Sequence, residues 1–451
     1  MKQSVFLPGF FLCLLTVSCT RETSQSISPF EDQSTFVSMS QAEAEVLKLL
    51  SVVDGEVKGP ATKRRIVEKY SLGGPDSATK SDGIEDPLVY VFNFNDNQGY
   101  AIASGDNRMP PVFCLVDKGH LSDTTSLPEG AIAMLSRIDT EYRMTVGLPI
   151  TDYVGNTVTA EQYAEYGVNM IRPDDDDSTY TLNTTWHNGP RMGTPLNCTW
   201  RQGKPFNEYC KTRDGNYAYV GCVAIAVGQV MFHWGYNTTY NGHDFNWNDM
   251  HRITRWVIPT IPYYANAWEQ VQLLLSDLGR SENLDMDYGE IDNSDGSSAY
   301  CENIQRTFLN FGYSNGGEIY DHNTETLKYN ILRGPVIGCG YSDKHVKTFL
   351  GFTISTSYSG GHEWVYDQYM EQERDYQTYS RKTGELIHTE KVTRTLVRCN
   401  WGWDGNSDGF YLSGSYDTED DRGLITKSQG HSSENPYYFQ YQLRMHIGIH
   451  P

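Results

Sequence analysis

The sequence predicts an α+β protein made of a small N-terminal unit and a larger domain that is helical first and β-rich later. The chain has 451 residues, too many for one ordinary hydrophobic core, so two or more domains are expected. The N-terminal third combines one segment of helical spacing with several alternating segments. In the larger part, helical spacing follows residue 222, and strand-like alternation begins at about residue 330.

The composition indicates a β-rich protein that works outside the cytoplasm. Aromatic residues make up 13% of the chain, and glycine and tyrosine are abundant. The formal net charge of −21 repels nucleic acid and anionic lipid, so no nucleic-acid partner is expected.

The first 19 residues predict a secretion signal. An apolar core from Val5 to Val17 follows a lysine and is too short to span a bilayer as a mature helix. The ending "LTVSC" resembles a bacterial lipobox, in which Cys19 would be lipidated. Lipidation and ordinary signal cleavage both remain open. We expect export to the cell surface, the periplasm or the medium, with membrane contact only through a lipid at Cys19.

The cysteines point to at least one free thiol and to no metal site. Of nine cysteines, Cys13 leaves with the signal and Cys19 is used if it is lipidated. The odd remainder implies at least one unpaired thiol. Spacing assigns no disulfide, and no zinc-ligand spacing is present. The remaining seven are Cys114, Cys198, Cys210, Cys222, Cys301, Cys339 and Cys399.

The N-terminal unit is expected to contain two helices and a small sheet. Ser40 and Glu43 predict a capping box before the helical run "AEVLKLLSVV". Residues 87–106 alternate around "NDNQG" and predict a hairpin, and "PPVFCLVDKG" predicts a third strand. A second helix is expected over 128–146, beginning at a proline.

Two polar segments predict the domain boundaries. Residues 20–35 form a tether after the signal. The segment "IRPDDDDSTY" (171–180) carries four adjacent aspartates, whose repulsion predicts an exposed linker. We expect an N-terminal domain over 20–172 and a second domain over 173–451. A calcium loop is the alternative for the linker, although the spaced acidic pattern of such loops is missing.

Cys222 is the first candidate for chemistry. The apolar spacing that follows predicts a helix that begins at Cys222 and stops at Gly235. A thiol in the first turn of a helix has a lowered pKa, which favours the nucleophilic thiolate. Gly221 would leave room for a substrate backbone. The alternative is a buried structural cysteine. The predicted apolar face consists of Val223, Ala226, Val227, Val230, Met231 and Trp234.

A general base would have to come from the 12 histidines. His362 follows two glycines in "SGGHEWVYDQY" and precedes a strand-like run, and the glycines allow close approach to its ring. His345 in "SDKHVKTFLGF" is the rival and lacks the glycines. An ordinary structural role is the alternative for either residue.

Two amides complete the constellation. Asn400 in "RCNWGWDG" could accept a hydrogen bond from the imidazole, while Trp401 covers that bond and excludes water. Gln202 could donate to an oxyanion. Cys222 precedes His362 by 140 residues, a spacing typical of papain-like enzymes.

These segments resemble the streptopain family of cysteine peptidases. The resemblance rests on "GCVAIAVGQVMFHW", "SGGHEWVYDQY", "NWGWDGNSDGFYL" and "WRQGKPFN", which occur in the family's order. The segment "LVYVFNFNDNQGYAIASGDNRMPPVFCLVDKG" is similar to the family's propeptide and inhibitor domains. The resemblance implies a papain-like fold, a helical part plus an antiparallel sheet, preceded by a small α+β propeptide domain that inhibits the enzyme.

The resemblance also implies a role for each site residue. Cys222 would be the nucleophile and His362 its general base. Asn400 would orient the imidazole, and Trp401 would shield that bond. Gln202 and the backbone N–H of Cys222 would form the oxyanion hole.

The chain departs from the family pattern after Asp367. Residues 368–396 are longer than is usual and predict a projecting hairpin around Lys382, Thr383 and Gly384, which either overhangs the cleft or decorates the surface. Gln368 stands where a glycine is commoner.

The predicted function is hydrolysis of peptide bonds by a self-processing cysteine endopeptidase zymogen, without metal or organic cofactor. Its partners would be protein substrates and its own propeptide. One alternative is a non-catalytic surface lipoprotein that binds glycan or protein, with Cys222 merely structural. The other is a papain-like acyl transferase or amidase.

Overall fold

The computed structural model describes residues 35–55, 63–72, 89–121, 150–151, 157–158, 179–253, 262–289, 296–349, 352–413 and 441–451. The predicted signal with Cys19, nearly all of the tether, the helix over 128–146 and most of the linker at 171–180 lie outside these ranges. Within them, no helix is long and apolar enough to cross a membrane.

The N-terminal unit packs one helix on an antiparallel sheet. The hairpin and third strand predicted from the sequence are confirmed as β2, β3 and β4. The predicted capping box is wrong, because the helix begins earlier: Ser38 Oγ accepts from Gln41 N, and Gln41 Oε1 accepts from Ser38 N. The elements are α1 (Met39–Asp54), β1 (Ile66–Leu72), β2 (Val89–Phe94), β3 (Tyr100–Ser104) and β4 (Val112–Val116).

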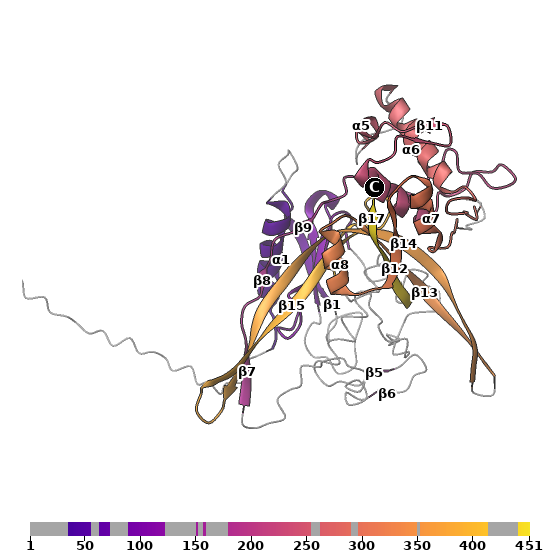
Figure 1. Cartoon of the computed structure of the whole chain (residues 1–451). Coiled ribbons are helices and arrows are strands. Elements are labelled where there is room, and N and C mark those ends of the chain that lie inside the picture. The colour runs from indigo at the N-terminus through magenta and orange to yellow at the C-terminus, as the bar shows by residue number, and fades with distance from the viewer. Residues whose placement is uncertain are drawn as a thin grey trace, which may run out of the picture.

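A single sheet runs from the N-terminal unit into the larger domain (Figure 1). Its order is β1-β2-β3-β4-β16-β15-β14-β13-β17-β12, with β7, β8 and β9 paired to β14. The antiparallel pairing of β4 with β16 makes the junction, with Leu115 opposite Phe410. The strands of the larger domain are β7 (Thr179–Asn183), β8 (His187–Asn188), β9 (Met192–Gly193), β12 (Asn315–Asp321), β13 (Val336–Phe349), β14 (Phe352–Ser380), β15 (Leu386–Asn400), β16 (Gly409–Leu412) and β17 (Tyr441–His450).

Two hydrophobic cores lie on opposite faces of this sheet. One core holds α4, α6 and α7 against residues such as Val365 of β14. The other holds the N-terminal unit and α8 against residues such as Trp364. The expected α+β class, helical first and antiparallel β later, is confirmed. The helices of the larger domain are α4 (Cys222–Trp234), α5 (Trp247–Met250), α6 (Ala265–Leu278), α7 (Asn303–Asn310) and α8 (Thr324–Ile331).

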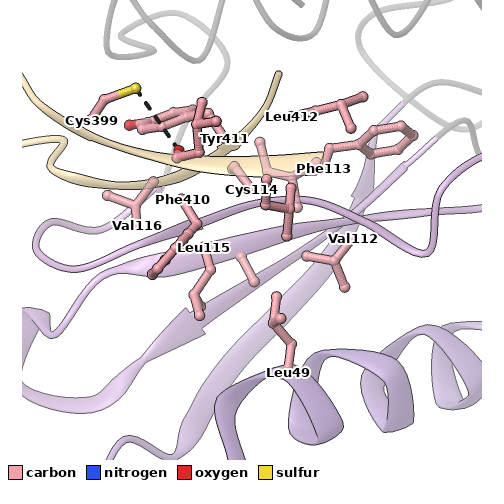
Figure 2. Packing of buried hydrophobic residues seen from close by; sticks show 14 of the residues in the cluster. Leu49, Val112, Phe113, Cys114, Leu115, Val116, Cys399, Phe410, Tyr411 and Leu412 are labelled. Atoms are coloured by element: carbon pink, nitrogen blue, oxygen red, sulfur yellow. Dashed lines mark hydrogen bonds between the residues drawn. The ribbon is translucent and has the colours of Figure 1, made fainter. Parts of the chain in front are cut away.

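The second core is continuous across the junction between the two domains. Figure 2 shows side chains of β4 beside those of β16, with Leu49 of α1 nearby. Phe113, Leu115, Phe410 and Tyr411 are all almost fully buried. Separating the N-terminal unit would therefore expose apolar surface on both sides of the junction, which water disfavours.

A buried ion cluster reinforces the junction. Arg398 of β15 donates to Asp367 at 2.6 Å and to Asp117 at 3.2 Å. Asp117 directly follows β4. Arg64 of the N-terminal unit also approaches Asp117, at 3.7 Å. The two carboxylates raise the pKa of Arg398 despite its burial, so its charge is retained.

The inserted segment is confirmed as a hairpin of β14 and β15, with Gly384 at positive φ in its turn. Strands β7, β8 and β9 line the outer edge of β14. Arg374 of β14 is buried over the ring of Trp186 and donates to the carbonyls of Asn107 and Arg108. The hairpin is therefore also a contact of the N-terminal unit.

We expect Asp117→Asn to weaken docking of the N-terminal unit by about 2 kcal/mol, because the buried Arg398 loses one of its two carboxylate partners. The measurement is the urea concentration at which the unit becomes sensitive to an added protease. Lys391→Ala is the matched control, since its pair with Glu373 is exposed and worth about 0–1 kcal/mol. Equal effects of the two substitutions would contradict the assignment.

Candidate active site

Cys222 is the first residue of α4, as predicted, and Gly235 ends the helix with φ 55°. Gly221 has φ 88°, and a Cβ there would lie 2.2 Å from Met286 Cε. The positive φ favours glycine at this position, and its role in substrate access stays a prediction. The helix is buried over its whole circumference from Val223 to Phe232, and not along one face only.

The Cys222 thiol, half-buried, donates a hydrogen bond to Glu363 of β14, with Sγ 3.0 Å from Oε2. Glu363 is only 8% exposed. Burial raises the pKa of Glu363 to about 7, although Cys222 and Arg444 act in the opposite direction. The nucleophile candidate is therefore held by a carboxyl group.

The expected lowering of the Cys222 pKa is wrong for this conformation. Burial, followed by the charge and hydrogen bonding of Glu363, raises the pKa of the thiol well above its ordinary value. Backbone N–H groups of Glu363 and Val223 do lower it, as expected at a helix start. Desolvation and the carboxylate outweigh them, so the sulfur carries its proton.

His362 lies in the core on the other face of the sheet. Its ring is 4.8 Å from that of Trp403 and packs beside those of Trp401 and Trp364. Nε2 lies 3.0 Å from the Trp401 carbonyl oxygen. That oxygen can only accept, so Nε2 carries the proton. Burial lowers the pKa of His362 to about 4, and the imidazole is neutral at pH 7.

The structure does not bring His362 to Cys222. Successive side chains of a strand point to opposite faces, and Glu363 occupies the face of α4. The expected thiolate–imidazolium pair is thus absent from this conformation. The rival His345 lies in β13, in a stretch whose side chains fall outside the described residues.

Asn400 has other partners than the imidazole expected for it. Its Oδ1 accepts from Gln229 Nε2 of α4 (3.0 Å) and from Gly402 N (3.1 Å). Its Nδ2 donates to the Cys198 carbonyl (2.9 Å). The amide lies on the face of α4, beside the helix that carries Cys222, while His362 lies on the opposite face.

The backbone of Gln202 is hydrogen-bonded to the segment that leads into Cys222. Its backbone carbonyl accepts from Val220 N (2.9 Å), two residues before Cys222, and its side chain is partly exposed. The neighbouring Arg201 pairs with Trp403. Trp401 is 1% exposed, and its ring stacks on that of His362. The hydrogen bond beside this ring joins His362 to the Trp401 carbonyl and not to Asn400.

Sequence reasoning missed Glu363 and Gln229. Glu363 directly follows the histidine, and strand alternation could have flagged it as the residue on the opposite face. Gln229 is a polar residue within an apolar helix, seven positions after Cys222, and buried polar side chains have partners. No group of three or more metal-ligating side chains gathers within the part of the chain that the structure describes.

Two protein families match the chain. Residues 200–411 match the Peptidase C10 family, and residues 34–142 match the Spi protease inhibitor. All five predicted site residues lie in the first match. The chain therefore contains a peptidase C10 domain and, before it, a Spi inhibitor domain. It is a cysteine peptidase preceded by an inhibitor domain, and its described elements have the expected α+β class.

Known relatives are distant in sequence. The chain is 24% identical to streptopain of Streptococcus pyogenes serotype M1 over 395 residues, 76% of each protein. It is 26% identical over 176 residues to thiol protease/hemagglutinin PrtT of Porphyromonas gingivalis, spanning 18% of that protein. Prevotella intermedia prointerpain A is 18% identical with a TM-score of 0.44, over 87% of this chain and 99% of that fragment.

We expect Glu363→Gln to change stability in a pH-dependent way. A carboxyl whose folded pKa is raised contributes full stability below its unfolded pKa of 4.5 and loses it as the pH rises through 7. The variant should match the wild type near pH 4 and be more stable by up to about 3 kcal/mol at pH 8. Urea unfolding across this range measures it.

Glu269→Gln on the exposed face of α6 is the control and should show no such trend. A stability difference between Glu363→Gln and the wild type that stays constant from pH 4 to pH 8 would contradict the buried, pH-sensitive carboxyl.

Proposed function

We propose that this conformation is a latent zymogen and that the mature enzyme hydrolyses peptide bonds with Cys222 as nucleophile and His362 as general base. The observation that carries the proposal is the 3.0 Å contact between the Cys222 sulfur and the residue that follows His362. A short displacement along the strand, which exchanges the faces of neighbouring residues, would put the imidazole where the carboxyl now lies.

In the mature enzyme, His362 takes the proton of the Cys222 thiol and forms a thiolate–imidazolium pair. The thiolate attacks the scissile carbonyl carbon, while the Gln202 amide and the Cys222 N–H stabilise the oxyanion. His362 then protonates the leaving amine and activates water to hydrolyse the thioester. Asn400 orients the imidazole, and Trp401 excludes water from that bond. These steps need no metal ion or organic cofactor.

The proposed latency depends on the N-terminal unit. The tryptophans around His362 belong to the same core as β3, β4 and α1. Trp401 contacts Tyr411, and Tyr411 of β16 lies opposite Cys114 of β4. Removing the N-terminal unit would take away packing that holds the imidazole on the wrong face.

We further propose the processing and export of the chain from its sequence. Residues 1–19 form a secretion signal, which ends either in ordinary cleavage or in lipidation of Cys19. Residues 20–172 form the inhibitor domain and residues 173–451 the enzyme. Cleavage near 171–180 would release the inhibitor. Strand β7 begins at Thr179, so a cut before it leaves the paired strand with the enzyme.

We expect Cys222→Ala and His362→Ala each to lower turnover at least about 10³-fold, because Cys222 forms the thioester and His362 transfers the protons. His345→Ala is the matched control and should keep activity. Peptide release from a protein library, followed by mass spectrometry, measures this. Loss of turnover in His345→Ala but not in His362→Ala would overturn the assignment, and transfer to an added amine in place of water would indicate an acyl transferase.

We expect purified full-length protein to acquire a new N-terminus within 171–180 on incubation. The four adjacent aspartates of this linker repel one another, which predicts an exposed segment open to cleavage. N-terminal sequencing of the product tests this, with the Cys222→Ala protein as the uncleaved control. A full-length product that stays uncleaved and is already active would rule out a zymogen.

A further inference from the structure

Two buried cysteines lie on the face of the sheet that α4 covers, the face of the candidate active site. Cys339 of β13 stands opposite Glu363 in the antiparallel pairing of β13 with β14. Cys301 lies in the turn that precedes α7. The two residues are 1% and 3% exposed, and both belong to the hydrophobic core that α4 occupies.

Arg444 holds this pair of sulfurs together from a third element. In the pairing of β13 with β17, Arg444 is the direct partner of Cys339. Its Nη2 donates to the Cys301 sulfur at 3.1 Å, and its Nη1 donates to Glu302 at 3.2 Å. The turn carrying Cys301 is therefore fixed over the strand that carries Cys339.

We propose that Cys301 and Cys339 form a disulfide bond when the protein folds outside the cytoplasm, leaving Cys222 as a free thiol. Two S–H bonds break and one S–S bond forms. The two protons and two electrons pass to an external disulfide, such as oxidised glutathione, which is reduced to two thiols. The proposal uses the proposed export of the chain but not its proposed activity.

The geometry favours this pair. A disulfide needs a sulfur–sulfur distance of about 2.05 Å, and Arg444, the strand partner of Cys339, already lies 3.1 Å from the Cys301 sulfur. Cys339 is held between two paired strands, whereas Cys301 lies in a turn that can adjust. Both are shielded from solvent in the folded chain, so the bond would form during folding and then be protected from reductants.

Other described cysteines have different neighbours. Cys210 lies beside Tyr288, and the Cys399 sulfur approaches the Val397 carbonyl at 3.9 Å. Cys114 is buried in the core of the N-terminal unit. Pairing Cys339 also removes a competing thiol from the strand opposite Glu363, the residue that holds Cys222.

The bond would tie the helical half of the enzyme to its sheet. It closes residues 301–339 into a loop and links the start of α7 to β13. Such a crosslink stabilises mainly by restricting the unfolded chain. The oxidised protein should melt roughly 5 to 15 °C above the reduced protein.

The test is to refold the full chain in an excess of oxidised over reduced glutathione, block free thiols with N-ethylmaleimide, digest without reductant and map crosslinks by mass spectrometry. We expect a peptide linking Cys301 to Cys339 and an alkylated Cys222. Cys301→Ala and Cys339→Ala should each abolish the crosslink. The double variant should melt at the same temperature with or without reductant, which separates the bond from any loss of packing.

Three outcomes would overturn the proposal: full alkylation of both thiols in the folded, oxidised chain, a crosslink between Cys222 and Cys339, or stable glutathione adducts on Cys301 or Cys339. Cys114→Ala, at a buried cysteine of the other domain, is the control and should retain the crosslink. The readouts are peptide masses and melting temperature, and neither depends on enzymatic activity. Failure of the disulfide proposal can therefore be told apart from failure of the proposed peptidase function.

Discussion

Along an extended strand each residue faces the side of the sheet opposite to its neighbours, and this constraint applies to His362 and Glu363 at the centre of the molecule. Only one of the two can face Cys222 on α4. Glu363 occupies that face here, and burial together with its carboxyl group keeps the thiol protonated. His362 is consequently buried among tryptophans, where desolvation keeps the imidazole neutral. The same few residues therefore determine both the latent state and the chemistry proposed for the mature enzyme.

The N-terminal unit is built into the enzyme and is not merely laid over a finished active site. Its strands extend the central sheet through β4 and β16, and its apolar side chains share a core with Trp364 and Trp401. The ion cluster around Arg398 and the contacts of Arg374 add polar links at two further points. An inhibitor domain attached in this way stabilises the position of His362 indirectly, through packing, at a distance from Cys222.

The insertion in β14 and β15 illustrates how a departure from the family pattern acquires a structural role. Its hairpin provides an edge for β7, β8 and β9, the first described elements of the larger domain. Arg374 then connects the hairpin to the carbonyls of Asn107 and Arg108. The alternatives considered from the sequence, a cover for the cleft or surface decoration, did not include this contact, because a strand pattern does not reveal what lies beside it.

The sequence by itself determined the local elements: a helix that begins at Cys222 and stops at Gly235, the hairpin of β2 and β3, the strand β4 and the hairpin around Gly384. These depend on turn residues, helix ends and apolar periodicity, all of which act over a few residues. The family blocks also identified the candidate residues. Only the tertiary structure decided that Glu363 meets Cys222, that Gln229 bonds to Asn400, and that Arg444, the strand partner of Cys339, contacts Cys301. Those contacts join residues far apart in the chain, and strand register and burial, which no short segment encodes, select them.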